Sequence, residues 1–263
     1  VAAPDADLAA AQAFVAVVGT GVEVVPEPAT GSNLLTRLVL LLRPPLETAE
    51  AKPSALAELP LVELPVATAG RLMAVVYSGD GGWRDLDKEI AERLQARGVP
   101  VVGVDALRYF WSEKSPDQVA GDLGLILDHY RTLWQRPDVV LIGYSFGADV
   151  LPFAYNRLRP EQQRTIRHLA LLGLAPSADM VIRVTGWLGV EAHPGSLPTA
   201  PELGRLPPEL VQCFYGAEEA DTACTAPELR GAELVRTAGG HHFDGNYTAL
   251  ADAILAAASR EHR

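Results

Sequence analysis

The sequence predicts an α/β fold with a mostly parallel central sheet and helices on both faces. From about residue 66 onward, apolar runs alternate with segments of helical periodicity. The expected strands are apolar on both faces, which is typical of a parallel sheet that is covered on each side. The chain has 263 residues, of which 48% are hydrophobic and 21% charged, so it can bury a substantial core.

The predicted elements follow one another in a regular order. Residues 71–79 form the first buried strand, and 83–98 follow as a helix that ends in a basic turn and a glycine. A strand over 99–107 precedes a helix over 115–134, whose N-cap is expected to be Ser115, followed by a proline. The remaining strands are expected at 138–145, 166–175, 210–216 and 232–239, and the remaining helices at 147–158 and 246–260.

The N-terminal part fits this alternation poorly. Residues 7–19 could form a helix and 36–45 a strand, with proline-rich joins between them. We expect residues 1–57 to be an N-terminal extension or the remnant of an upstream domain, and 58–263 to form the main domain. Because the chain begins with valine, we also expect a processed or trimmed form, from which a signal peptide could have been removed.

The charge balance excludes some classes of partner. The formal net charge is −11, and no basic patch stands out, so nucleic acid is not an expected partner. No apolar stretch reaches the roughly 18 residues of a membrane-spanning helix. We expect no cofactor and no metal site, since ligand residues do not occur at suitable spacing.

Residues 143–147 read Gly-Tyr-Ser-Phe-Gly and match the pattern G-x-S-x-G. This pattern forms a strained turn between a strand and a helix and exposes the serine hydroxyl at its tip. The pentapeptide is weak evidence by itself, but here it lies between a predicted strand and a predicted helix. Ser145 is therefore the candidate nucleophile; the alternative is a small residue at a packing turn.

A serine nucleophile needs a histidine as its general base. Residues 239–247, GGHHFDGNY, place His241 and His242 on a glycine loop between the last strand and the last helix. His241 directly follows the glycines and is the preferred base, and His242 is expected to line or orient the site.

The acid of such a site should lie after the preceding strand, in YGAEEADTAC. Glu219 stands three residues past the glycine, whereas Asp221 has the shorter side chain and the more common chemistry; both remain candidates. Cys213 and Cys224 are the two cysteines of the chain and flank this loop, so a disulfide between them is expected. It would hold the loop and whichever acid is used.

Backbone N–H groups must stabilise the negative charge of a tetrahedral intermediate. One donor is expected from Phe146, and the other from Gly79 or Asp80 in the glycine-rich loop SGDGGW. The Asp80 carboxylate is unusual there; it could point away or bind an ammonium group of the substrate. The other side chains expected at the substrate are aromatic: Tyr144, Trp83, Tyr109 and Trp111. Core packing is the alternative for Tyr109 and Trp111. Residues 180–198 stand where this type of fold inserts a lid.

Several of these segments resemble one family. YSGDGGW, GVDALRYFW, IGYSFGADVLPFAYNRL, CFYGAEEADTAC and GGHHFDGNY together are similar to the VirJ/AcvB-type bacterial virulence proteins, over roughly residues 58–258. The resemblance implies an α/β-hydrolase fold, export to the periplasm and serine hydrolase chemistry. For some members it implies hydrolysis of lysyl- or alanyl-phosphatidylglycerol, an aminoacylated phospholipid at the membrane surface.

Three functions are compatible with these residues. The first is an aminoacyl-phosphatidylglycerol hydrolase, and the second is a serine esterase or thioesterase with another acyl substrate. The third is a binding protein associated with export, with components of a secretion system as partners. A complete Ser–acid–His set with a glycine-rich loop favours the two enzymes over the third.

Overall fold

The computed structural model describes residues 2–3, 25–26, 53–182 and 195–260. The chain divides into two compact units, Val1–Ala51 and Lys52–Arg263. In the first unit the described residues are two short strands, β1 (Ala2–Ala3) and β2 (Val25–Pro26), which pair in parallel. The helix predicted at 7–19, the strand predicted at 36–45 and most of the segment proposed as a lid lie outside the described residues.

The second unit is built on a seven-stranded sheet in the order β11-β10-β7-β6-β4-β5-β3. All strand pairs in this sheet are parallel except β3 with β5. The mostly parallel sheet that the apolar runs predict is thus confirmed. The strands are β3 (Leu61–Leu64), β4 (Leu72–Tyr77), β5 (Val101–Val104), β6 (Asp138–Tyr144), β7 (Ile166–Leu172), β10 (Val211–Gly216) and β11 (Glu233–Thr237).

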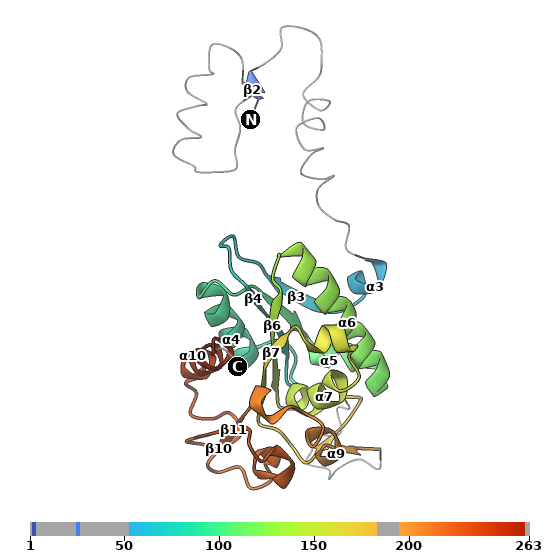
Figure 1. Ribbon diagram of the computed structural model, residues 1–263, viewed down its shortest axis with the longest axis vertical. Coiled ribbons are helices and arrows are strands. Elements are labelled where there is room, and N and C mark those ends of the chain that lie inside the picture. The colour runs from blue at the N-terminus through green and yellow to red at the C-terminus, as the bar shows by residue number, and fades with distance from the viewer. Residues whose placement is uncertain (1, 4–24, 27–52, 183–194, 261–263) are drawn as a thin grey trace. The chain divides into compact units, whose positions relative to one another are not determined.

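Helices cover both faces of the sheet (Figure 1). Helices α4 (Asp85–Ala96) and α10 (Tyr247–Ala258) pack together on one face, and α6 (Pro116–Leu133) and α7 (Phe146–Tyr155) on the other. Each face has its own cluster of buried apolar side chains. The predicted N-cap of α6 is confirmed, since Ser115 and Gln118 form a capping box. Within the described ranges, no helix has the length and apolar character that crossing a bilayer requires.

Short elements complete the described part of the second unit. They are helices α3 (Ser54–Ala57), α5 (Ala106–Tyr109), α8 (Pro160–Gln163) and α9 (Ala200–Leu203), the strand pair β8 (Ser177–Ala178) and β9 (Leu197–Pro198), and the 3-10 turns η3 (Pro208–Leu210), η4 (Ala223–Thr225) and η5 (Pro227–Leu229).

Two features of the N-terminal side differ from the sequence pattern. Strand β3 was not predicted, because the prolines at 60 and 65 that flank it signal a break. It is an edge strand, where flanking prolines are tolerated. Helix α3 also belongs to the second unit, since Leu56 is fully buried in the core on the α6 side. The structure therefore divides the chain after Ala51, whereas the sequence pattern places the boundary after residue 57.

The second predicted strand is shorter than expected. Strand β5 ends at Val104 because Asp105 begins helix α5, where its Oδ1 accepts a hydrogen bond from the Arg108 N–H at 3.3 Å. A side chain that binds backbone N–H groups in this way starts a helix.

The loops after β4, β6, β10 and β11 all leave the carboxyl edge of the parallel strands. Ligands of open α/β sheets bind at this edge. The four segments that the sequence analysis singles out for chemistry are these four loops.

Candidate active site

Ser145 stands in a strained turn between β6 and α7. Its backbone has φ 52° and ψ −121°, a conformation that residues other than glycine rarely adopt. The Ser145 N–H donates to the Leu172 carbonyl of β7 at 2.8 Å, which fixes the turn on the sheet. An ideal Cβ at Gly147 would lie 2.3 Å from the Tyr77 carbonyl oxygen, so α7 can approach β4 only with glycine there. This is the local geometry that the G-x-S-x-G pattern predicts.

Three side chains from three loops form a continuous chain of hydrogen bonds. His241 Nε2 lies 2.7 Å from Ser145 Oγ. On the other side of the ring, His241 Nδ1 lies 2.6 Å from Glu219 Oε1. The order along the polypeptide is serine, acid, histidine.

The chemistry of Glu219 decides how the histidine is protonated. A carboxylate can only accept, so His241 Nδ1 carries the proton that it shares with Glu219. Nε2 then has a free lone pair and accepts the hydrogen bond of the Ser145 hydroxyl. This tautomer suits a general base that receives the serine proton.

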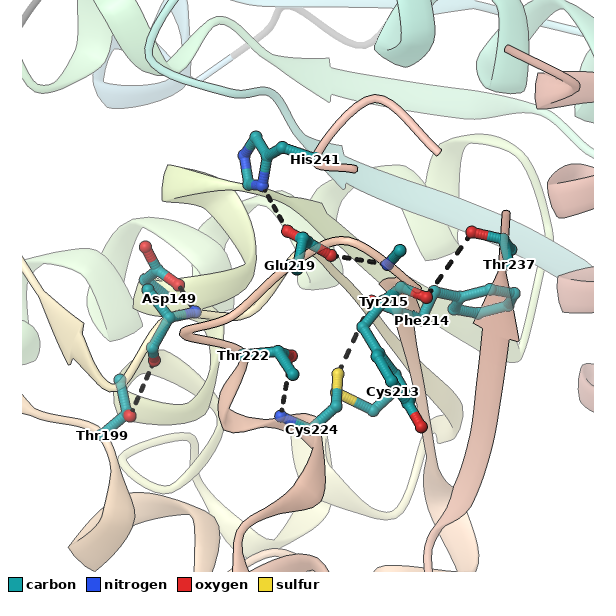
Figure 2. Close-up of a disulfide and its surroundings, with 12 residues drawn as sticks. Asp149, Thr199, Cys213, Phe214, Tyr215, Glu219, Thr222, Cys224, Thr237 and His241 are labelled. Carbon is teal, nitrogen blue, oxygen red and sulfur yellow. Dashed lines mark hydrogen bonds and ion pairs between the residues drawn. A yellow bond between two sulfur atoms is a disulfide. The ribbon is translucent and has the colours of Figure 1, made fainter. Parts of the chain in front are cut away.

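Glu219 is held by the backbone as well as by His241. Its Oε2 accepts the Gly216 N–H at 2.6 Å, and its side chain is only 12% exposed (Figure 2). Asp221, the other candidate acid, is exposed. The structure therefore brings Glu219, and not Asp221, to the histidine.

His242 lies beside the Ser145–His241–Glu219 chain. Its Nδ1 is 2.9 Å from the hydroxyl of Tyr144, which also donates to the His241 carbonyl at 3.3 Å. Burial raises the pKa of Tyr144, so its phenol stays protonated. Tyr144, which was expected at the substrate, thus connects the histidine loop to the end of β6. His242 is linked to the site by its hydrogen bond with the Tyr144 hydroxyl.

Gly173 is a site residue that sequence reasoning missed. It follows β7 with φ +67°, and an ideal Cβ there would lie 2.8 Å from His241 Cε1. Any side chain at this position would displace the imidazole. A glycine near the end of the strand predicted at 166–175 was the available signal.

The backbone donors expected for an oxyanion lie next to Ser145. Phe146 is the first residue of α7, and the first N–H groups of a helix have no acceptor within it. On the opposite loop, an ideal Cβ at Gly79 would lie 3.6 Å from Ser145 Cβ. Asp80 follows Gly79 and is partly buried. Both sides of the predicted oxyanion hole are thus adjacent to the serine.

A second carboxyl, Asp149, lies one turn into α7. Its Oδ1 accepts the Ala175 N–H at 2.7 Å. Burial first, and then the charges of Asp179 and Asp80, raise the pKa of Asp149 well above its usual range, although the Ala175 N–H opposes this. The site therefore concentrates acidic groups close to the serine helix.

The aromatic side chains expected at the substrate fall in different places. Tyr109 is 4% exposed and donates to Asp122 Oδ2 at 2.5 Å, so it belongs to the core. Trp83 is partly buried and its ring packs over Gly103 of β5. For Tyr109 the alternative of core packing therefore holds, and a substrate contact of Trp83 stays a prediction. Trp111 is 65% exposed.

The sequence matches one protein family over most of its length. Residues 71–262 fit the bacterial virulence protein family VirJ. The chain belongs to the VirJ family. No curated protein matches it by sequence.

Solved structures share the fold of this VirJ protein at low sequence identity. TT1662 from Thermus thermophilus has a TM-score of 0.54 and 18% identity over 79% of this chain and 97% of its own. MenH from S. aureus has a TM-score of 0.54 and 13% identity over 76% and 99%. A lipase-esterase related protein from Clostridium acetobutylicum has a TM-score of 0.51 and 14% identity over 75% and 98%. The VirJ chain therefore has an α/β-hydrolase fold, as the resemblance implies.

The expected disulfide of this VirJ protein is confirmed. Cys213 in β10 and Cys224 in η4 are bonded, with their Cα atoms 5.5 Å apart (Figure 2). The Cys224 N–H also donates to the Thr222 hydroxyl at 3.2 Å. The bridge closes the loop that carries Glu219 and fixes its two ends.

Removing this disulfide is expected to destabilise the VirJ protein. The Cys213→Ala/Cys224→Ala variant should lose about 2–3 kcal/mol of unfolding free energy. Without the cross-link between two residues that are 11 apart in the sequence, the unfolded chain has more conformational entropy. Urea unfolding of both proteins measures the difference. The control adds reductant: wild type should fall to the level of the variant, and the variant should not change. Equal stability of the two proteins without reductant would contradict the prediction.

Proposed function

We propose that this protein is a serine hydrolase that cleaves the aminoacyl ester of aminoacyl-phosphatidylglycerol. Ser145 is the nucleophile, His241 the general base and Glu219 the group that orients the histidine. The observation that carries the proposal is the chain of two short hydrogen bonds, 2.7 Å and 2.6 Å, that links these side chains. A nucleophile that is hydrogen-bonded to a base, which an acid in turn orients, forms the catalytic unit of hydrolases with unrelated folds.

The reaction follows from the atoms of this site. Ser145 Oγ attacks the ester carbonyl carbon while His241 Nε2 takes the hydroxyl proton. The N–H groups of Phe146 and of the loop that holds Gly79 and Asp80 stabilise the oxyanion. When the intermediate collapses, the ester C–O bond breaks and the phosphatidylglycerol oxygen receives the proton from His241. Water, deprotonated by His241, then attacks the carbonyl carbon of the aminoacyl-serine ester. The bond from that carbon to Ser145 Oγ breaks, Oγ takes the proton back from His241, and the free amino acid leaves.

The substrate class rests on charge and on the family. An aminoacyl group carries at least one ammonium, and the charges of Asp80 and Asp179 both act on Asp149 in the serine helix. A protein of net charge −11 also suits a cationic group better than an anionic one. The motifs shared with VirJ/AcvB-type proteins favour lysyl- or alanyl-phosphatidylglycerol.

Export is part of the same proposal. A disulfide is compatible with an exported protein, since cytosolic thiols are kept reduced. Aminoacylated lipids at a bacterial membrane surface are accessible from the periplasm, which is the compartment that we propose.

The deciding experiment measures amino-acid release from micelles of lysyl- and alanyl-phosphatidylglycerol. Wild type is expected to release the amino acid from at least one lipid, and Ser145→Ala is expected to release none, because it lacks the attacking oxygen. Ser259→Ala, at the exposed end of α10, is the matched control and should act as wild type.

Three other outcomes would contradict the proposal. Turnover of p-nitrophenyl acetate that requires Ser145, without release from either lipid, would indicate a serine esterase with another acyl substrate. No turnover of any of the three esters would favour a binding protein. Release that persists in Ser145→Ala would show that Ser145 is not the nucleophile.

A further inference from the structure

Ser78 carries a buried hydroxyl that the mechanism above does not use. It directly follows β4, begins the glycine-rich loop SGDGGW and is 0% exposed. A hydroxyl that is shielded from water needs hydrogen-bond partners within the protein, because leaving it unpaired costs free energy. The partners of Ser78 therefore indicate what the side chain holds in place.

The Ser78 hydroxyl both accepts and donates a hydrogen bond. Its Oγ accepts the Ala106 N–H at 2.9 Å and donates to the Gly79 carbonyl oxygen at 3.1 Å. Ala106 is the first residue of α5, and the first N–H groups of a helix have no acceptor within it. A hydroxyl has a single proton, and here that proton is committed to the Gly79 carbonyl. The side chain thus connects the loop after β4 to the helix after β5.

The Gly79 carbonyl oxygen has a second donor in the same loop. The Gly82 N–H binds it at 3.1 Å and closes a tight turn over residues 79–82. Gly82 has φ +81°, and an ideal Cβ there would lie 3.0 Å from Asp105 Oδ1, so the turn requires glycine at this position. Two hydrogen bonds therefore fix the direction of one carbonyl beside the candidate nucleophile.

The direction of this carbonyl sets the direction of the next N–H. In a trans peptide, the C=O of one residue and the N–H of the next point to opposite sides. The Gly79 carbonyl points to the fully buried Ser78 hydroxyl, so the Asp80 N–H points away from it, toward the less buried side on which Ser145 stands. An ideal Cβ at Gly79 would lie 3.6 Å from Ser145 Cβ, which puts this peptide next to the serine.

We propose that Ser78 is a positioning residue of the oxyanion hole, which holds the Gly79 carbonyl so that the Asp80 N–H is the second oxyanion donor beside that of Phe146. This inference rests on the proposed serine hydrolase function. Without the Ser78 hydroxyl, the Gly79–Asp80 peptide keeps only its hydrogen bond from Gly82 and can rotate. Donors stabilise an oxyanion well only when they are aligned before the reaction, so this rotation slows the chemical step.

The first measurement is the turnover of p-nitrophenyl acetate by Ser78→Ala. Removing an oxyanion donor outright costs about 10²–10³-fold, and here the donor is misaligned rather than removed, so kcat/KM should fall about 10- to 100-fold. Ser78→Cys fills nearly the same space but has only a weak S–H donor. It should also lose about tenfold or more, and it is the variant to measure if alanine unfolds the protein.

The affinity for phenylboronic acid tests the oxyanion hole itself. Ser145 Oγ bonds to the boron and passes its proton to His241 Nε2, and the boron becomes tetrahedral and negatively charged. This adduct resembles the tetrahedral intermediate, so its dissociation constant in Ser78→Ala should rise by about the factor by which kcat/KM falls. Titration calorimetry measures it, and Ser145→Ala, which cannot form the adduct, should bind none.

Thr165→Ala is the matched control for the loss of a buried hydroxyl. Thr165 Oγ1 donates to the Gln162 carbonyl at 2.7 Å, directly before β7 and therefore at the opposite, amino edge of the sheet. Both alanine variants should melt a few degrees below wild type, because each loses a buried hydrogen bond. Thr165→Ala should nevertheless keep kcat/KM and the phenylboronic acid affinity within about twofold of wild type.

Two results would overturn this inference and leave the proposed function intact. A folded Ser78→Ala with kcat/KM within about twofold of wild type would show that the hydroxyl does not align the donor. A fall in kcat/KM without a loss of phenylboronic acid affinity would place the defect outside the oxyanion hole. A wild type that lacks Ser145-dependent turnover of p-nitrophenyl acetate and binds no phenylboronic acid would instead overturn the proposed function and this inference together.

Discussion

Replacing Glu219 with glutamine is expected to lower kcat about 10⁴-fold, because it inverts the protonation of His241. In the wild type Oε2 accepts the Gly216 N–H and Oε1 accepts from His241 Nδ1. A glutamine keeps its oxygen on the Gly216 N–H and turns its NH₂ group toward the ring. Nδ1 must then accept, so the proton moves to Nε2, and His241 can no longer receive the Ser145 proton.

Asp221→Asn is the matched control for this prediction. Asp221 stands in the same loop but is exposed, so its amide variant should keep kcat within about twofold. Initial rates with p-nitrophenyl acetate and with the lipid substrate measure both variants, and thermal unfolding verifies that both fold. A large loss in Asp221→Asn with little loss in Glu219→Gln would assign the acid to Asp221 instead.

The sequence was most informative where apolar periodicity and position in the fold agree. The predicted strands from β4 to β11 and the helices α4, α6, α7 and α10 are all present. Except for β11, these strands are buried, and buried parallel strands leave continuous apolar runs. Strand β3 was missed because its burial is partial and prolines flank it. The prolines decide, since β11 is also a partly buried edge strand and its sequence was still recognised as a strand.

The site could be located from sequence but not resolved in detail. Neighbouring residues such as His241 and His242 share one loop, and only the path of the backbone decides which ring reaches Ser145. Glu219 and Asp221 likewise share one loop. Only the turn of the backbone that brings the Glu219 side chain to the Gly216 N–H decides which of the two acids reaches the histidine.

Adding a single methyl group at Gly147 is expected to cost about 3 kcal/mol of unfolding free energy. The Cβ of Gly147→Ala would lie 2.3 Å from the Tyr77 carbonyl oxygen and 2.8 Å from that of Ser78. Both neighbours are backbone atoms of the strand end, so no change of rotamer can relieve the clash. Helix α7 must move away from β4, and Ser145 must move with it. Urea unfolding measures the loss of stability, and kcat should fall in the protein that remains folded.

Gly121→Ala separates this clash from the general effect of replacing a glycine. Gly121 lies in α6, and nothing comes within 4 Å of a Cβ built there, so alanine should stabilise the helix by about 0.5–1 kcal/mol. The two substitutions add the same atom to a helix and are expected to change stability in opposite directions. If Gly147→Ala instead kept both stability and kcat, the close approach of α7 to β4 would not be what positions Ser145. The strained turn at Ser145 would then have to be held by its other anchor, the hydrogen bond from its N–H to Leu172 in β7.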